Sequence, residues 1–199
     1  MEQEDARAQL ATLVRWIHGK GWAPGTGGNY SVVLSRAPLR LLMTPSGIDK
    51  GLVTPEGLLA VDENAQLLSG EGKPSAEALI HVAIAETTSA QVILHTHSVS
   101  NTLLSFLPEG FALEGYEMLK ALEGVRTHEH SESIPILDNS QEMVSFSDEV
   151  RVLLKDKPQT HGFLMRGHGL YTWGDSFFSA KRHLEALEFM FEVEAERRR

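Results

Sequence analysis

The sequence Gln91-Val92-Ile93-Leu94-His95-Thr96-His97-Ser98 decides how the rest of the chain is interpreted. Its aliphatic and β-branched residues predict a short buried strand, and two histidines fall where that strand ends. Because side chains two residues apart on a strand point to the same face, His95 and His97 could offer two imidazoles to one metal ion. A pair of solvated histidines at the end of a strand is the alternative, since His-x-His also occurs by chance.

The composition narrows the class of protein. The chain has 199 residues, 42% of them hydrophobic and 23% charged, which is typical of one globular domain spanning residues 1–199. Its net charge of −9 argues against nucleic acid or an anionic membrane as the main partner, because both need a basic face. The acidic N-terminus and the lack of an apolar run of about 18 residues predict a cytoplasmic protein. With no cysteine, any metal must be held by nitrogen and oxygen ligands.

Helical and strand patterns are intermixed along the chain, which predicts a layered α/β domain. Residues 109–133 are predicted to be irregular except for a helical turn at 115–120, and Pro135 suggests an edge strand. Ser75 is the predicted N-cap of its helix, and Asp175 or Ser176 that of the last helix. The other predicted helices span 4–20, 99–107 and 141–155, and the helix capped by Ser75 ends at 86. Further strands are predicted after the glycine-rich turn at 25–28 and at 39–43, 58–61, 65–68, 133–137, 160–166 and 170–173.

Three loops rich in glycine and hydroxyl residues could present N–H groups to one anion. They span residues 25–31, 44–47 and 70–75, and the last leads into a helix whose N-terminus favours phosphate. Taken singly, the first loop is better explained as a tight turn before a strand. Together they predict a phosphate site made of neutral groups, which suits an acidic protein.

His168 is the candidate for a third metal ligand. It lies between two glycines in a predicted tight turn, and a catalytic zinc site uses three protein ligands and leaves one position open. Spacing alone does not prove that His168 meets the first pair. Glu77 either stabilises the first turn of its predicted helix or points a carboxylate at the metal. A second pair, His128 and His130, follows no apolar strand, and we expect it to lie in a solvated loop.

Five motifs, in this order, resemble those of the class II aldolase/adducin family, which includes epimerases. They span nearly the whole chain and are Gly25–Ser31, Thr44–Gly47, Lys73–Glu77, His95–Ser98 and Arg166–Gly169. Two further stretches, Gly115–Lys120 and His130–Ser140, resemble the methylthioribulose-1-phosphate dehydratase branch of that family, which acts in methionine salvage.

This resemblance implies an α/β/α fold with a mostly antiparallel central sheet, and a homotetramer with active sites between subunits. It implies one Zn²⁺ per subunit on His95, His97 and His168, and a catalytic acid/base at Glu117. Glu77 is the metal neighbour and base of the aldolases, and not all dehydratases keep it. The implied phosphate-binding residues are Gly28, Asn29, Ser46, Gly47 and Ser75.

The expected reaction is therefore the zinc-dependent dehydration of 5-methylthioribulose-1-phosphate, a sugar phosphate, to 2,3-diketo-5-methylthiopentyl-1-phosphate. As proton shuttle, Glu117 needs a pKa well above that of a free glutamate, which a dry pocket could provide. A class II sugar-phosphate aldolase or epimerase that uses Glu77 as base stays open as an alternative. So do a non-catalytic assembly module of the same fold and a hydrolase that uses a metal-activated water.

Overall fold

The computed structural model describes residues 3–199, so the first two residues of the predicted domain lie outside the described range. Five α-helices occur in this range: α1 (Gln3–Gly19), α2 (Ala78–Thr87), α3 (Val99–Leu104), α4 (Met143–Asp156) and α5 (Phe177–Arg197). Two short 3-10 helices are η1 (Lys50–Leu52) and η2 (Glu117–Ala121). The strands are β1 (Asn29–Arg36), β2 (Leu39–Met43), β3 (Leu59–Asp62), β4 (Leu67–Ser69), β5 (Val92–Thr96), β6 (Phe111–Glu114), β7 (Ser131–Ile134), β8 (Ile136–Leu137), β9 (Gly162–Met165) and β10 (Gly169–Gly174).

The stretch that contains His95 forms the middle of the main sheet. This eight-stranded sheet has the order β4-β3-β2-β1-β5-β10-β9-β8, so β5 lies between β1 and β10. All neighbours are antiparallel except β8 and β9, which run parallel. A separate two-stranded sheet pairs β6 with β7. The predicted α/β fold with a mostly antiparallel sheet is confirmed.

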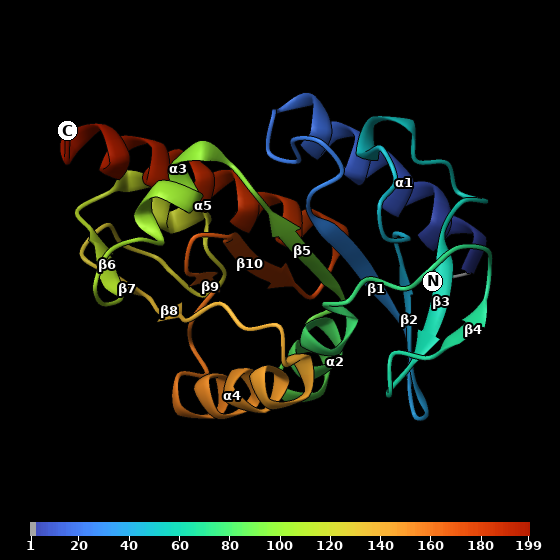
Figure 1. The fold of residues 1–199 in the computed structure, drawn as a ribbon. Helices are drawn as coiled ribbons and strands as arrows, with labels where there is room; N and C mark the ends of the chain where they lie inside the picture. Colours follow the sequence, from blue (N-terminus) through green and yellow to red (C-terminus); the bar gives the residue numbers. More distant parts are fainter. Residues whose placement is uncertain (1–2) are drawn as a thin grey trace.

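Helices cover both faces of the main sheet, as Figure 1 shows, with α1, α3 and α5 on one side and α2 and α4 on the other. The alternation along β5 explains this arrangement. Val92 and Leu94 are buried in the core beneath α1 and α5, whereas Ile93 is buried in the core beneath α2 and α4. A central strand that is apolar on both faces needs cover on both, which gives the α/β/α layers.

The helix that leads out of residues 70–75 begins later than predicted. α2 starts at Ala78, and Glu77 occupies the position just before it, so the predicted N-cap at Ser75 is wrong. The hydroxyl oxygen of Ser75 instead accepts a hydrogen bond of 3.2 Å from the Glu77 backbone N–H. The chain therefore makes a turn between Ser75 and Ala78. This turn fixes the backbone of Glu77, from which its side chain extends. The last helix starts as predicted, because Ser176 and Ser179 form a capping box.

Residues 109–133 are more ordered than predicted. β6 lies inside the segment expected to be irregular, and its partner is β7, on the far side of η2. Pro135 divides the predicted strand 133–137 into β7 and β8, because a proline has no N–H to donate to a sheet. β8 is an edge strand of the main sheet, as Pro135 had suggested.

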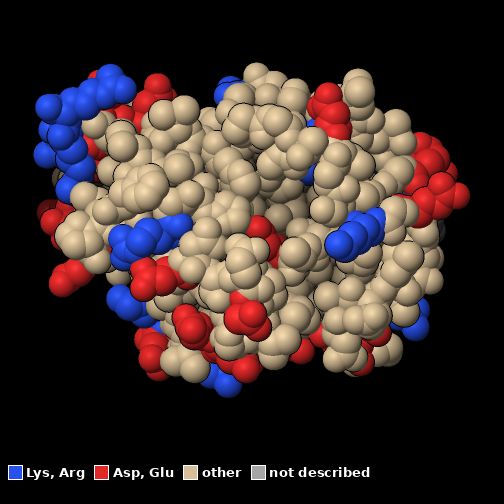
Figure 2. Space-filling view, viewed as in Figure 1, with Lys and Arg blue, Asp and Glu red and all other residues tan. Residues whose placement is uncertain are grey.

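Charged side chains are dispersed over the surface. Figure 2 shows acidic and basic groups scattered on the visible face, with the densest basic group at the C-terminal end of α5. Within residues 3–199, no helix combines enough length with enough apolar character to cross a bilayer.

A buried ion pair joins β7 to the start of β9. Glu132 is 2% exposed, and its carboxylate accepts hydrogen bonds from the His161 ring at 3.1 Å, the His161 backbone at 2.9 Å and the His130 ring at 2.9 Å. Burial favours a raised pKa for Glu132, but these hydrogen bonds outweigh burial and lower it. Burial also disfavours the charged form of His161, yet its pKa is raised because Glu132 and the Glu123 carbonyl both accept from the ring. His130, predicted to be solvated, is thus part of a buried contact.

The stability contributed by this pair should depend on pH. A lowered carboxyl pKa contributes stability that disappears as the pH falls through it, and a raised histidine pKa contributes stability that disappears as the pH rises through it. The contribution is complete between about pH 4.3 and 6.5, the usual values of the two free groups. In that window, Glu132→Gln should lower the free energy of unfolding by about 3 kcal/mol, measured by urea denaturation. The exposed Glu129→Gln is the control, and an equal loss in both variants would contradict the assignment.

Candidate metal centre and active site

The register of three strands brings the predicted site together. His95 on β5 is paired with Asn29 on β1 and with Tyr171 on β10. A tight turn between β9 and β10 places His168 beside the end of β5. This turn requires glycine at position 169, because a Cβ there would lie 2.0 Å from the Thr96 carbonyl oxygen. The close approach of Gly169 to β5 therefore places His168 beside His95.

Three imidazole nitrogens lie close together at the end of β5. The Nε2 atom of His95 lies 2.8 Å from Nε2 of His97 and 3.3 Å from Nε2 of His168. Candidate ligand atoms of the three residues all lie within 4.8 Å of one another. The Nδ1 atom of His95 donates to the Leu170 carbonyl at 2.9 Å, so its Nε2 carries the lone pair that a metal needs.

The electrostatics of the site keep the rings of His95 and His97 neutral. Burial lowers the pKa of His95 well below its usual value, and the neighbouring His97 and His168 lower it further. Burial and the nearby His168 lower the pKa of His97 to about 4. Histidine binds a metal ion as the neutral imidazole, so the pair is in the correct form at neutral pH.

Glu77 closes the group with a negative charge. Its carboxylate oxygens lie 3.3 Å from Nε2 of His95 and 3.4 Å from Nε2 of His168. Burial tends to raise the pKa of Glu77, but the proximity of His95 and hydrogen bonds from Tyr171 and Asn29 hold it at about 2. Three imidazole nitrogens with a carboxylate beside them are a donor set that fits a divalent metal ion.

A buried chain of hydrogen bonds orients Glu77. Burial lowers the pKa of His81 to about 4, so its ring is neutral. Its Nε2–H donates to Oδ1 of Asn29 at 2.5 Å, and its Nδ1 accepts from the Ser31 hydroxyl at 2.7 Å. The Asn29 side chain then donates from Nδ2 to Glu77 at 3.0 Å. The Asn29 amide thus joins His81 to Glu77, and the role of Asn29 in phosphate binding stays a prediction.

The other predicted phosphate-binding residues lie in neighbouring loops. Gly28 has a φ of +77°, and a Cβ there would lie 2.7 Å from the His95 carbonyl oxygen. The Ser46 backbone N–H donates to the Lys73 carbonyl at 2.9 Å, which holds the loop 44–47 against the segment that contains Ser75. Gly47 is exposed, with a φ of +73° and no atom near its missing Cβ. The three loops are therefore near the histidines or joined to one another, and their role in phosphate binding stays a prediction.

Glu117 lies apart from the histidines. Its side chain is 75% exposed, at the start of η2, and its ion-pair partners are Lys120 at 2.5 Å and His128 at 4.0 Å. The hydrogen bond from Lys120 lowers the pKa of Glu117, so the expectation of a raised pKa in a dry pocket is wrong for the single chain. The physical reason is that no other part of residues 3–199 covers the Glu117 carboxylate. The catalytic role of Glu117 stays a prediction.

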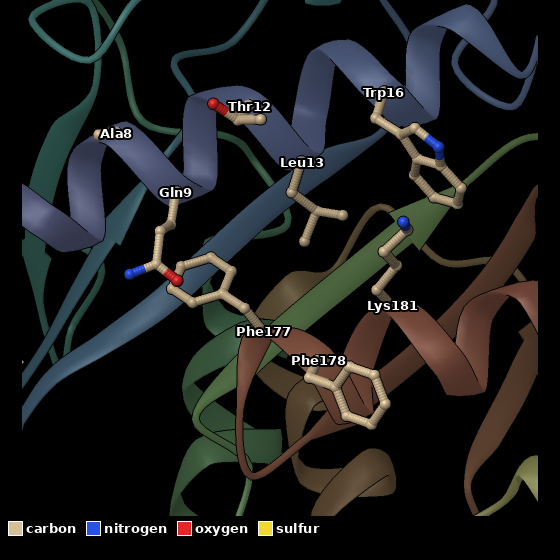
Figure 3. A pocket seen from close by; sticks show the side chains of 8 residues that line it. All are labelled: Ala8, Gln9, Thr12, Leu13, Trp16, Phe177, Phe178 and Lys181. Atoms are coloured by element: carbon tan, nitrogen blue, oxygen red, sulfur yellow. The ribbon is translucent and has the colours of Figure 1, made fainter.

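A separate hollow of about 450 Å³ lies between α1 and the start of α5 (Figure 3). The Lys181 ammonium lies 4.4 Å from the centre of the Trp16 ring across this hollow. Its lining contains none of the predicted site residues, so it is not the candidate active site. The lining residues are Ala8, Gln9, Thr12, Leu13, Trp16, Phe177, Phe178 and Lys181.

Comparisons with known proteins agree with this geometry. The model of the class II aldolase and adducin N-terminal domain matches residues 8–195. The chain belongs to the class II aldolase and adducin family. Methylthioribulose-1-phosphate dehydratase of Yersinia enterocolitica is 43% identical, over 95% of this chain and 90% of the relative. The enzyme of that name from Pseudomonas savastanoi pv. phaseolicola is 39% identical, over 100% of this chain and 98% of the relative.

Solved structures share the fold of this chain. YgbL of Klebsiella pneumoniae, described as a putative aldolase/epimerase/decarboxylase, superposes with a TM-score of 0.81 at 24% identity. That match covers 97% of this chain and 89% of YgbL. An L-fuculose 1-phosphate aldolase also gives a TM-score of 0.81, at 20% identity, over 98% of this chain and 86% of that chain. At these identities the likeness establishes the family fold alone.

Two residues of the site were missed by sequence reasoning. The Tyr171 ring stacks on His95 with centroids 4.0 Å apart, and its hydroxyl donates to Glu77. Lys50 is 1% exposed, and its Nζ donates to the Thr26 carbonyl at 2.7 Å, which fixes the glycine-rich loop from inside. Burial lowers the pKa of Lys50. Only the strand register reveals Tyr171, and no motif in the sequence distinguishes Lys50 from a surface lysine.

Removing one histidine should abolish metal binding. We expect His95→Ala to lose the bound metal ion, because two remaining nitrogens cannot complete the donor set. Metal content after dialysis and titration against a chelator measure this directly. His128→Ala is the matched control, since His128 is exposed and belongs to no group of metal-ligand side chains among residues 3–199. Full metal occupancy in the His95 variant would contradict the assignment.

Proposed function

We propose that this protein is a methylthioribulose-1-phosphate dehydratase, a hydro-lyase of methionine salvage. The observation that carries the proposal is identity of 39–43%, over nearly the full length, with curated relatives of that name. The cluster of His95, His97 and His168 supports it, because a metal-dependent reaction needs such a centre. The proposed enzyme is a cytoplasmic homotetramer with one Zn²⁺ per subunit.

The proposed substrate is a ketose phosphate with a methylthio group at the far end. His95, His97 and His168 would hold the metal ion, which supplies Lewis acidity at the C2 ketone and so makes the neighbouring C3 hydrogen more acidic. The loops that contain Gly28, Ser46 and Ser75 would bind the phosphate through N–H and hydroxyl groups. Anchoring the phosphate converts remote binding energy into orientation of C2 to C4.

The net reaction removes one molecule of water. The C3–H bond breaks as the proton passes to a base, and the C4–O bond breaks as the hydroxyl leaves with a proton. The resulting enol then tautomerises to the 2,3-diketone, so no oxidant or reductant is needed. Glu117 is the proposed proton shuttle, because one carboxyl group can accept the proton at C3 and donate it at C4. Glu77, held as a carboxylate by Tyr171 and Asn29, contributes negative charge beside the metal ligands.

The exposure of Glu117 supports an active site shared between subunits. In one chain its carboxylate contacts Lys120 and His128 and none of the three histidines. A neighbouring subunit that covers Glu117 would exclude water and raise its pKa, as a general acid requires. We therefore propose that Glu117 of one subunit completes the metal centre of another.

Incubation with methylthioribulose-1-phosphate tests the function. We expect the metal-loaded protein to convert it to a diketone with the same number of carbon atoms, detected by mass spectrometry. Glu117→Gln should keep its metal and lose most turnover, by about 10²–10⁴-fold, because the amide cannot transfer the proton. The exposed Glu114→Gln serves as control. Full turnover in the Glu117 variant would remove this residue from the mechanism.

Mixing inactive subunits tests the shared site. Co-expressed Glu117→Gln and His95→Ala subunits should regain part of the activity, since some sites then combine an intact metal centre with an intact Glu117. Neither variant alone should show it. No recovery in verified mixed oligomers would mean that Glu117 does not act on a neighbouring subunit.

A retro-aldol reaction is the second candidate function. It is favoured by the position of Glu77, within 3.4 Å of both His95 and His168, where an aldolase places its base. Such a reaction would break a carbon–carbon bond and release a three-carbon fragment. Product analysis of the same incubation separates the two functions, because only dehydration preserves the carbon chain.

A further inference from the structure

The strand that carries the metal histidines is held from behind by a carboxyl group. Thr96 lies between His95 and His97 and faces the opposite side of the sheet, toward α5. There Glu188 accepts hydrogen bonds of 2.8 Å from the Thr96 hydroxyl and 2.8 Å from the side-chain amide of Asn101. A hydrogen bond from Ser98 also reaches Glu188.

Glu188 is an unusual residue for its position. It is 3% exposed, on the face of α5 that buries Leu184, Leu187 and Phe191 in the core. Its hydrogen-bond partners in residues 3–199 are neutral side chains, without a cation among those identified. Burial raises the pKa of Glu188 to about 7. A buried acid without a cation is costly to place in a core, and its hydrogen bonds from Thr96, Ser98 and Asn101 offset part of that cost.

The residues that Glu188 binds are those that set the path of the chain around His97. β5 ends at Thr96, and the His97 backbone N–H donates to the Trp22 carbonyl at 2.8 Å, outside the sheet. Sheet pairing therefore fixes His95 but not His97. Beyond the strand, Asn101 also donates to the Thr96 hydroxyl at 3.1 Å and to its carbonyl at 3.3 Å. Ser98 accepts from the Asn101 backbone at 3.0 Å and so caps α3.

We propose that Glu188 is a positioning residue of the metal centre: by binding Thr96, Ser98 and Asn101 it fixes the turn on which His97 stands relative to His95. The proposal rests on the metal site of the proposed function and not on the substrate. Groups that hold metal ligands from behind strengthen metal binding by orienting those ligands before the ion arrives. Glu77 and Glu188 thus act on opposite faces of the same strand.

Metal affinity should fall in Glu188→Leu and be kept in Glu188→Gln. We expect the affinity for Zn²⁺, measured by chelator competition, to fall about 10–100-fold. The urea midpoint of the metal-free protein should fall, because the buried donors of Thr96, Ser98 and Asn101 lose their acceptor, and the same measurement shows that the variant is folded. Glu188→Gln keeps an oxygen acceptor and should keep an affinity close to that of the parent. The matched control is Glu185→Gln, one turn earlier on the exposed face of α5.

Co²⁺ substitution adds a second measurement. The visible absorption bands of bound Co²⁺ should shift in Glu188→Leu, because they report ligand geometry, and stay unchanged in Glu185→Gln. If Glu188→Leu fails to fold, Thr96→Val removes the hydrogen-bond donor with little change in shape and should weaken Zn²⁺ binding in the same way. Parental Zn²⁺ affinity and Co²⁺ bands in a folded Glu188→Leu or Thr96→Val protein would overturn the proposal. Neither measurement uses the substrate, so a failure of the proposed reaction is recognised separately.

Discussion

The antiparallel register of β1, β5 and β10 sets Asn29, His95 and Tyr171 in one row across the middle of the sheet. All three contact Glu77, which enters from the turn before α2. A shift of one residue in β5 would turn His95 to the other face and break every one of these contacts. The apolar residues on both faces of β5 prevent such a shift, because it would exchange the residues buried in the two cores. The packing of the sheet thus fixes the chemistry of the site.

The site concentrates polar groups that are costly to bury. His81 and His95 are fully buried. Both ring nitrogens of His81 have hydrogen-bond partners, whereas His95 donates to the Leu170 carbonyl and directs its other nitrogen at His97. Both rings are neutral because burial lowers their pKa values. The negative charge of Glu77 has no neutralising lysine or arginine among its described partners. The negative charge of Glu77 is therefore neutralised only when a cation is bound, and metal binding should stabilise this region of the fold.

Much of the fold was predictable from periodicity and breakers. The limits of β2 were predicted to the residue, and the hairpin of β3 and β4 and the helices α1, α4 and α5 were close. The metal candidates were also predictable, because His95 and His97 share a strand and His168 is fixed by two glycines. One of the failures was a missed strand pairing. β6 pairs with β7 across an intervening segment, and a long-range pairing leaves little trace in local sequence.

The contacts that orient the site were hidden from the sequence for a similar reason. Tyr171, Lys50 and Glu188 lie in three separate elements, and each reaches the site through a tertiary contact without a motif of its own. The glutamates illustrate this best, because from residue type alone the same pKa is expected for all four of them: Glu77, Glu117, Glu132 and Glu188. Their environments then separate them: the pKa of Glu77 is held at about 2, whereas that of Glu188 is raised to about 7.

The contrast between Glu77 and Glu117 bears on the proposed active site shared between subunits. Glu77 is rigidly held beside the histidines, and its low pKa suits a permanent carboxylate rather than a group that must take up and release a proton. Glu117 is exposed next to Lys120, where it is also ionised and free to change its surroundings. A proton shuttle must cycle between two forms at neutral pH, so Glu117 can serve only where burial offsets the effect of Lys120. Residues 3–199 of a single chain provide no such cover. The proposed reaction therefore requires that assembly into an oligomer raises the pKa of Glu117, whereas the fold of each subunit positions the metal ligands.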